Sequence, residues 1–381
     1  MRKLVTSLAI LIFGAGVVRA QWTMQESHTK ADLRGIHNVG NGVAWASGTN
    51  GTVLRTLDDG ATWTACAVPP DAEKLDFRGV QAFDADTAIV MSSGKGDLSR
   101  LYKTTDGCKS WKLVFKNPDK EGFWDALRFD RPQSGWLLGD PVNDRFTLFS
   151  SHDRGQTWRG QHHKGLDARA AIQGAFAASN SSMEGMNGGM SFGTGGTEGA
   201  FIYSVTEVGI CLDDCSPEDV MRAEQSTKWA RVAVPIGDHS EASGIFSLAE
   251  IHDPGNSTWF KASFVAVGGN YTKPDDSYAT AAFTSDGEKS WIPAQTFPHG
   301  YRSAVAYDEA TKTWITVGPN GTDISTDDGR NWRAAQPNAA LHETPDADRN
   351  WNALSLPFVV GPHGRIGKLD SEVIIRLNNG K

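Results

Sequence analysis

The chain has 381 residues, of which 39% are hydrophobic and 22% charged, and it contains 13 Trp and 41 Gly. Abundant aromatic residues and mixed charges exclude an intrinsically disordered chain. The formal net charge of −8 argues against general binding to nucleic acid or anionic lipid.

The first 20 residues have the pattern of a secretory signal peptide. Arg2 and Lys3 supply positive charge, residues 4–18 form an apolar stretch, and Val18-Arg19-Ala20 is a small-residue cleavage site. The apolar stretch is short for a lasting membrane span, although an uncleaved anchor is the alternative interpretation. Cleavage would change the formal net charge from −8 to −11, because three positive charges leave. We therefore predict a secreted or periplasmic protein, with residues 21–381 forming one domain and no transmembrane segment after cleavage.

One phrase, in which a hydroxyl residue is followed by Asp, Gly and Trp, occurs five times. The copies span residues 56–63, 104–111, 151–158, 284–291 and 325–332. The Asp and Ser/Thr side chains of such a phrase can bond nearby backbone N–H groups, and the Gly accepts the positive φ of a tight turn. The Trp begins the next strand and buries its ring between sheets. We therefore interpret these aspartates as turn-forming rather than catalytic: Asp58, Asp106, Asp153, Asp286 and Asp327.

Each phrase closes a longer unit that contains two earlier strands, and seven such units follow one another with little helical periodicity. The inner strands are expected to begin at Arg34-Gly35-Ile36, Arg78-Gly79-Val80, Asp125-Ala126-Leu127, Gln173-Gly174-Ala175, Ser243-Gly244-Ile245, Arg302-Ser303-Ala304 and Asn352-Ala353-Leu354. The next strands are expected to end at Gly48, Gly94, Gly139, Gly195, Gly268, Gly318 and Gly361. Short antiparallel sheets repeated every 40 to 50 residues or so are typical of propeller blades.

Two units depart from the pattern. The fourth lacks the Asp phrase, and an insertion with Cys211 and Cys215 takes its place before Trp229 resumes the outer strand. The seventh lacks its Trp strand, which residues 21–24 would supply. If a strand near the N-terminus pairs with the strands of the seventh unit, the ring closes and no sheet edge is left exposed. The predicted fold is all-β, a seven-bladed β-propeller whose last blade is completed by the N-terminal strand.

The four cysteines fit an oxidising compartment. Cys211 and Cys215 are close enough in sequence for a small local loop, which would leave Cys66 to pair with Cys108. Unpaired buried thiols are the alternative. No His pair accompanies the cysteines at a zinc-like spacing.

The five phrases are similar to the Asp boxes of the bacterial-neuraminidase-type repeat. The whole pattern resembles the exported propellers related to the photosystem II stability/assembly factor family, and the resemblance covers essentially all of residues 21–381. It implies a protein of binding and assembly rather than catalysis, with a basic patch for which Arg34, Arg78 and Arg302 are candidate counterparts. Asp boxes also occur in sialidases, xyloglucanases and sortilin-like receptors, so the repeat defines a fold and not a function.

The aligned units place seven side chains at the mouth of a central channel: Arg34, Arg78, Asp125, Gln173, Ser243, Arg302 and Asn352. Three guanidinium groups around one opening would form a site for a carboxylate or phosphate. Alternatively, the arginines pair with Asp125 or with main-chain carbonyls and plug the channel.

Other side chains near this ring are candidates for ligand contact. Trp124 and Tyr301 are candidate stacking surfaces for a sugar or planar ligand, unless they belong to the core. Asp125 and Asp140 are the candidate carboxylate pair of a glycoside hydrolase, which needs two acids roughly 5 to 10 Å apart. The alternative is that these acids are solvated. Seven units rather than six, and a missing Phe-Arg-Ile-Pro signature, speak against a sialidase.

The glycine-rich run at residues 185–199 lacks the Lys-Ser/Thr ending of a phosphate loop, so we interpret it as a flexible loop of the fourth unit. Dinucleotide, serine-elbow and zinc motifs are absent from the sequence, and we expect no cofactor and no metal. We predict a monomer that binds a protein, or an anionic or carbohydrate small ligand, in an assembly role. A carbohydrate-active glycoside hydrolase is the alternative.

Overall fold

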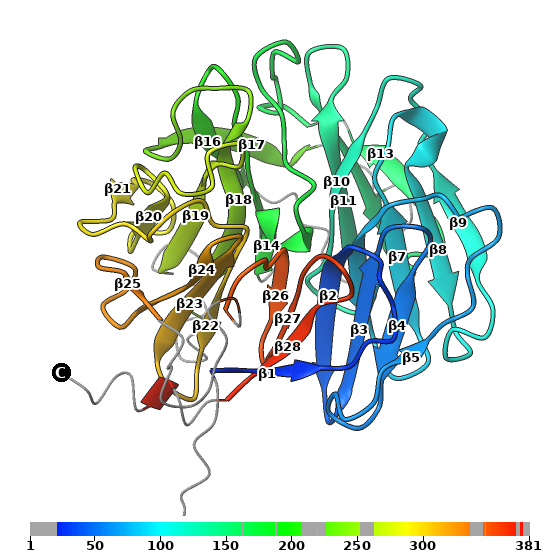
Figure 1. Cartoon of the computed structure of the whole chain (residues 1–381). Helices are drawn as coiled ribbons and strands as arrows, with labels where there is room; N and C mark the ends of the chain where they lie inside the picture. Colours follow the sequence, from blue (N-terminus) through cyan, green and yellow to red (C-terminus); the bar gives the residue numbers. More distant parts are fainter. Residues whose placement is uncertain are drawn as a thin grey trace, which may run out of the picture.

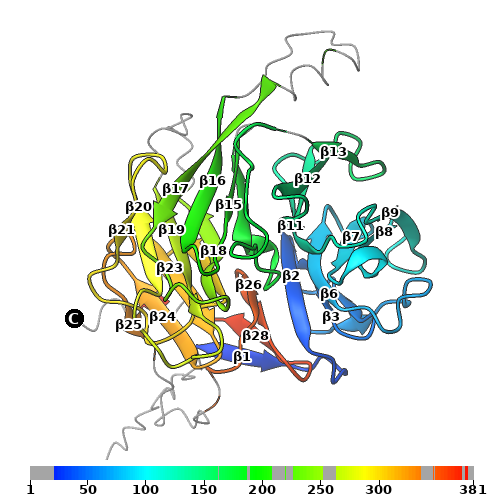
Figure 2. The ribbon, with the colours of Figure 1, turned by 90° about the horizontal axis from the view of Figure 1, so that it is seen from above.

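The computed structural model describes residues 21–161, 163–186, 189–207, 219, 226–251, 263–335, 346, 348–370, 374 and 375. The strands of these residues form seven four-stranded antiparallel sheets. The sheets stand around a common axis, as blades of a propeller (Figure 1), and the view from above shows the ring (Figure 2). Among the residues described, no helix has the length and hydrophobicity that a membrane crossing would need.

Six blades are each built from four strands that are consecutive in sequence, with the first strand next to the channel and the fourth at the outer edge. Blade 1 contains β2 (Leu33–Gly40), β3 (Val43–Gly48), β4 (Val53–Thr56) and β5 (Thr64–Ala65). Blade 2 contains β6 (Phe77–Ala82), β7 (Ala88–Ser92), β8 (Arg100–Thr104) and β9 (Lys112–Lys116), with the 3-10 helix η1 (Gly96–Leu98) before β8. Blade 3 contains β10 (Trp124–Phe129), β11 (Gly135–Pro141), β12 (Phe146–Ser151) and β13 (Arg159–Gln161).

The other three of these blades follow the same plan. Blade 4 contains β14 (Met183–Met186), β15 (Gly189–Gly193), β16 (Ala200–Glu207) and β17 (Lys228–Val234), preceded by the 3-10 helix η2 (Asn180–Ser182). Blade 5 contains β18 (Ser243–Glu250), β19 (Phe264–Asn270), β20 (Ala281–Thr284) and β21 (Ile292–Pro293). Blade 6 contains β22 (Ala304–Asp308), β23 (Thr313–Gly318), β24 (Gly321–Ser325) and β25 (Arg333–Ala334).

Blade 7 joins distant parts of the chain. It contains β26 (Ala353–Ser355), β27 (Phe358–Val360) and β28 (Ile366–Leu369), and its outer strand is β1 (Trp22–Gln25). In both ribbon views the blue β1 lies beside the red β28 (Figure 1, Figure 2). Trp22 pairs with Leu369 and Gln25 with Ile366. The seven-bladed fold and its closure by the N-terminal strand are therefore confirmed.

The core consists of the interfaces between blades. Every residue of β19 and of β27 is buried, because both faces of a blade pack against its neighbours. The Trp residue of each Asp box lies in such an interface and is at most 8% exposed. Trp63, for example, meets Phe358 of blade 7 edge to face, with the ring centroids 5.6 Å apart.

The Asp boxes connect the third and fourth strands of a blade. In blade 1 the Asp58 carboxylate accepts hydrogen bonds from the Thr62 backbone N–H (2.8 Å) and from the hydroxyls of Thr62 (2.7 Å) and Thr56 (2.9 Å). The Thr56 hydroxyl in turn accepts from Gly60 N–H (2.9 Å). These bonds, led by that of the Thr62 hydroxyl, lower the pKa of Asp58. Equivalent carboxylate bonds occur at Asp106, Asp153, Asp286 and Asp327.

A disulfide joins blade 1 to blade 2. The Cys66 and Cys108 sulfurs are bonded at 2.03 Å, as one of the two predicted pairings requires. Cys66 directly follows β5, and Cys108 belongs to the Asp box of blade 2. The other candidate pair, Cys211 and Cys215, lies outside the described residues.

Blade 4 differs from the prediction. Its inner strand is β14 and does not begin at Gln173-Gly174-Ala175, and the run predicted as a flexible loop supplies parts of β14 and β15. The Gly-rich sequence can form these strands because β14 and β15 pair with each other and β15 pairs with β16. Trp229 does resume the outer strand, in β17.

The segment before β14 lies among the inner strands. The Asn180 side chain donates to the Val80 carbonyl of blade 2 (3.0 Å) and accepts from the Leu127 N–H of blade 3 (3.1 Å). The hydroxyls of Ser247, in blade 5, and Ser181 are hydrogen-bonded at 2.9 Å. Helix η2 therefore lies in the channel between the inner strands, and its hydrogen bonds connect blades 2, 3 and 5.

Candidate functional site

One face of the propeller carries the loops that lead from blade to blade. Leu33, at the start of β2, pairs with Gly48, at the end of β3, so these two ends lie on the same face. The loops between the second and third strands open on this face, which we call the crossover face. The Asp boxes connect third and fourth strands and therefore lie on the opposite face.

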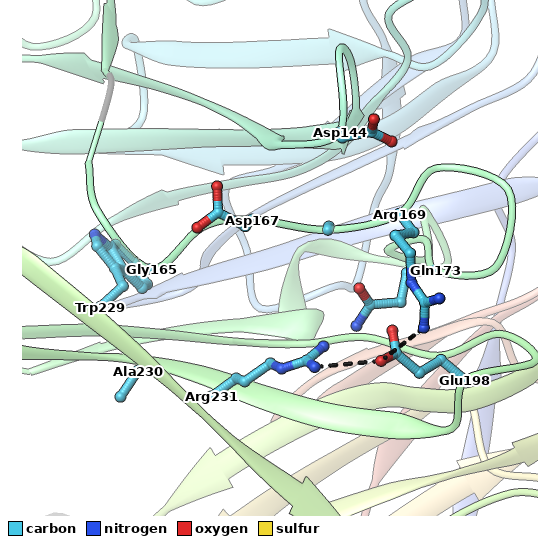
Figure 3. Close-up of a pocket in the computed structure, with 10 residues that line it drawn as sticks. Asp144, Gly165, Asp167, Arg169, Gln173, Glu198, Trp229, Ala230 and Arg231 are labelled. Atoms are coloured by element: carbon cyan, nitrogen blue, oxygen red, sulfur yellow. Dashed lines mark hydrogen bonds and ion pairs between the residues drawn. The ribbon is translucent and has the colours of Figure 1, made fainter.

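A hollow of about 540 Å³ lies between blades 3 and 4 on the crossover face. In Figure 3 the Glu198 carboxylate stands between Arg169 and Arg231, with N···O distances of 3.3 and 3.2 Å. Burial alone would raise the pKa of Glu198, but the two arginines lower it overall. Asp144 and Asp167 line the opposite side of this hollow, so both signs of charge are present.

A second hollow, of about 560 Å³, lies between blades 2 and 3. Its lining includes Phe115, Phe149 and Trp158, and the rings of Phe115 and Trp158 are stacked with centroids 6.5 Å apart. Asn143 and Arg145 border it. This hollow therefore offers an aromatic surface with a polar edge.

A third hollow, of about 390 Å³, lies near the channel mouth and is called the channel-mouth hollow below. Three carboxylate residues line it, Glu121, Asp140 and Glu241, together with the ring of Phe176. Among the residues that the structure describes, its lining contains no lysine, arginine or histidine. The hollow is therefore acidic.

The end of β11 and the loop that follows it, residues 140–145, join the three hollows. Asp140 and Pro141 line the channel-mouth hollow, Asp144 lines the hollow between blades 3 and 4, and Asn143 and Arg145 line the hollow between blades 2 and 3. We call these three hollows, together with residues 140–145, the binding surface. Sequence reasoning named Asp140 and the Asp-box residue Trp158 but missed the hollows themselves, because their linings combine residues of neighbouring blades that no local motif brings together.

The predicted arginines do not share one location. Arg34 and Arg78 both contact Asp76, at 3.2 and 2.8 Å, and both side chains are 30% exposed. Arg78 also donates to the Ala177 carbonyl (3.2 Å), in the segment that enters the channel. The structure therefore brings two of the three arginines together around a carboxylate.

Arg302 lies in a separate, closed network within blade 6. Its side chain is fully buried, and its Nε donates to Asp323 Oδ2 at 2.8 Å. Nη1 donates to Asn320 Oδ1 at 2.7 Å, and Nη2 lies 2.9 Å from His299 Nδ1. Asp323 is only two strands away in the fold but 21 residues away in sequence, so the pairing could not be read from the repeat.

The other predicted contact residues are also in structural positions. Trp124 is buried and stacks on Phe115, and Tyr301 is buried against the edge of another aromatic ring. The Asn352 side chain donates to the Leu33 carbonyl at 2.8 Å. Among the described residues, the aromatic one that lines the channel-mouth hollow is Phe176, which sequence reasoning did not single out.

Asp125 and Asp140 are close enough to influence each other electrostatically. Asp125 is 1% exposed, and neither carboxylate oxygen has a hydrogen-bond partner among the described residues. Burial raises the pKa of Asp125 well above its usual value and the Asp140 carboxylate raises it further, while Arg78 lowers it. Burial also raises the pKa of Asp140 to about 6, although Ala175 N–H donates to its Oδ1 at 3.0 Å.

We expect Asp125→Asn to make the protein more stable than the wild type at about pH 8 and equally stable near pH 4. The folded state raises the pKa of Asp125, so the wild type loses stability as the pH rises from the unfolded pKa toward the folded one. Asparagine cannot ionise and avoids this loss. Thermal unfolding at several pH values measures it. The control is Asp144→Asn on the same surface. A Tm difference for Asp125→Asn that does not change with pH would contradict the prediction.

Metal binding finds no support among the residues described, where no three His, Cys, Asp or Glu side chains gather closely enough to hold an ion. The sequence-based expectation that there is no cofactor remains a prediction.

Comparison with known proteins places the fold among a group of propellers. No family model matches the chain. The photosystem II assembly lipoprotein Ycf48 of Picosynechococcus sp. is 22% identical over 224 residues, which is 46% of this chain and 63% of that protein. The match thus spans less than two thirds of the relative.

Solved structures cover more of the chain. A structure described as YCF48 bound to D1 peptide covers 96% of this chain and 99% of its own, with a TM-score of 0.55 and 14% identity. YCF48 from Cyanidioschyzon merolae covers 93% of this chain and 100% of its own, with a TM-score of 0.58 and 17% identity. The GH74 xyloglucanase from Xanthomonas campestris covers 92% of this chain and 53% of its own, with a TM-score of 0.55 and 16% identity. The predicted resemblance to photosystem II assembly factor propellers is confirmed, and at these identities it establishes the fold.

Proposed function

We propose that this chain is an exported propeller that binds a polypeptide segment of a partner protein on the binding surface and acts in its assembly. The observation that carries the proposal is that one short segment, residues 140–145 at the end of β11 and in the loop after it, lines three hollows at once. The similar propeller YCF48 bound to D1 peptide supports a protein partner.

The chemistry of the hollows favours a polypeptide over one small ligand. One hollow is aromatic, one carries both signs of charge, and one is acidic. A small molecule is usually enclosed by a single pocket with a few convergent polar groups. Successive side chains of a peptide can instead occupy neighbouring hollows of different character.

We also propose that Arg34 and Arg78 bind an acidic group of the partner. Both guanidinium groups are partly exposed and contact the same Asp76 carboxylate, for which an acidic side chain of the partner can substitute. Arg302 takes no part, because it is fully buried and its charge is paired with Asp323.

We expect a photo-crosslinking residue at Ala171 or at Ala230 to capture the same partner in the cells that produce the protein naturally. Ala171 is exposed in the channel-mouth hollow and Ala230 in the hollow between blades 3 and 4, so a bound segment would contact both. The control position is Lys109, which is exposed in an Asp box on the opposite face. Mass spectrometry of the adducts checks the result. Equal capture from Lys109, or no adduct from either alanine, would count against the proposal.

A glycoside hydrolase is the second candidate, because the GH74 xyloglucanase shares the fold and a carboxyl pair adjoins a hollow. Asp125, however, is 1% exposed and does not line the hollow, so it cannot reach a substrate in this conformation. Release of reducing sugar from xyloglucan, abolished in Asp140→Asn, would favour the hydrolase.

A further inference from the structure

We propose, building on the proposed function, that the channel-mouth hollow holds a basic side chain of the partner, with its cationic group between the Asp140 carboxylate and the Phe176 ring. Nothing in the motifs of the chain indicates such a site, and it differs in sign from the anion site predicted at the arginines. The proposal names the partner's chemistry at one position of the binding surface.

The first support is the charge of the hollow. Its described lining includes Glu121, Asp140 and Glu241 and no basic residue. Glu121 has an exposed ion pair with Lys95, which is worth little in solvent. The Asp140 carboxylate is held in place, because its Oδ1 accepts the Ala175 N–H at 3.0 Å. Its Oδ2 has no hydrogen bond to a described residue and is left for a ligand.

The second support is independent of this acidic lining. Asp125 is 1% exposed, and both of its carboxylate oxygens lack a hydrogen-bond partner among the described residues. Its carboxylate lies near the Asp140 carboxylate and the Asp140 backbone N–H, both of which affect its pKa. Asp125 therefore lies beside Asp140, which lines the hollow. A buried, unpaired carboxyl is costly, and a cation bound at Asp140 would lower that cost.

The third support is the aromatic wall. Phe176 stacks on Phe246 with centroids 4.0 Å apart and planes 20° apart, which fixes the ring in position. An aromatic face next to a carboxylate suits a guanidinium or ammonium group. A metal ion fits less well, because the described carboxylates are not clustered tightly enough to share one. A side chain with several N–H donors can reach carboxylates that are further apart.

The hollow should bind cations more strongly as the pH rises through about 6, because burial raises the pKa of Asp140 to that value. Below it, the neutral carboxyl attracts a cation only weakly. Arg78 opposes protonation of Asp125, whereas burial favours protonation of both aspartates. Glu121 and Glu241 are the other charged residues of the described lining.

The test is a titration of the purified protein with acetyl-Gly-Arg-Gly amide, followed by nuclear magnetic resonance. The matched probes are the citrulline peptide, which has nearly the same shape without the charge, and the lysine peptide, which distinguishes ammonium from guanidinium. We expect the arginine peptide to bind at least about tenfold more tightly than the citrulline peptide. We also expect Asp140→Asn to weaken it about tenfold. Glu309→Gln, which removes an equal charge from the opposite face, should leave the affinity unchanged.

A second variant keeps the test informative if Asp140→Asn perturbs the loop. Phe176→Leu should weaken the arginine peptide while leaving the citrulline peptide unaffected. Equal affinities for the arginine and citrulline peptides, no binding of either, or equal losses in Asp140→Asn and Glu309→Gln would each overturn the cation site. Such a result together with undiminished crosslinking at Ala171 and Ala230 would leave the proposed function standing. Absence of all crosslinks would instead contradict the proposed function, regardless of the affinities measured for the peptides.

Discussion

Trp22→Ala is expected to destabilise the protein by about 3–5 kcal/mol, the usual cost of truncating a buried large aromatic residue. Trp22 is 1% exposed, and its indole N–H donates to the Thr322 hydroxyl of blade 6 at 3.0 Å. Its ring lies 5.8 Å from that of Trp351. The substitution therefore leaves a cavity in the interface between blades 6 and 7 and weakens the strand that closes the ring. Urea unfolding followed by circular dichroism measures the loss.

Met24→Ala is the matched control. Met24 lies two residues further along β1 and is 44% exposed, so its truncation should change the stability by no more than about 0.5 kcal/mol. Equal effects of the two substitutions would mean that the Trp22 contacts contribute little beyond the strand pairing itself.

Removing the disulfide, as Cys66→Ala with Cys108→Ala, should cost about 4 kcal/mol. The two cysteines are 42 residues apart, and a crosslink of that span restricts the unfolded chain by roughly this amount. The bond also joins the edge of blade 1 to the turn that closes blade 2. Thermal unfolding of the double variant, with and without reductant, measures the effect.

Reduction of the wild-type protein is the internal control for this prediction. Reductant should lower the Tm of the wild type to that of the double variant and should leave the double variant unchanged. A wild-type Tm that is insensitive to complete reduction would contradict the stabilising role of the bond.

The sequence predicted the architecture well because the repeat depends on local chemistry. Each Asp box holds its turn through hydrogen bonds within a few residues, as between Asp58 and Thr62, so the motif can be recognised without knowledge of distant contacts. The last unit lacks a Trp strand, and residues 21–24 form a strand that belongs to no other unit. Together these two observations predicted the closure, because an open ring would expose a sheet edge.

The candidate site could not be predicted to the same degree. The burial of Arg302 depends on Asp323, two strands away in the same blade, and the burial of Trp124 depends on Phe115 of the neighbouring blade. The repeated motif indicates neither pairing. The prediction misplaced the inner strand of blade 4 because the preceding segment folds into the channel, where Asn180 bonds backbone groups of two other blades. Contacts between blades come from the closed ring and have no local signature.

The closure of blade 7 also has a consequence for the order of folding. Strands of blades 1 to 6 pair with neighbours that are close in sequence, whereas Trp22 contacts a residue 300 positions away. Contacts of such separation form late, so β1 should dock after the other blades and be the first strand to exchange its amide hydrogens. While β1 is undocked, β28 presents a free strand edge, and the β1 of a second copy can pair with it. High concentration during refolding should therefore favour strand-exchanged dimers joined at blade 7.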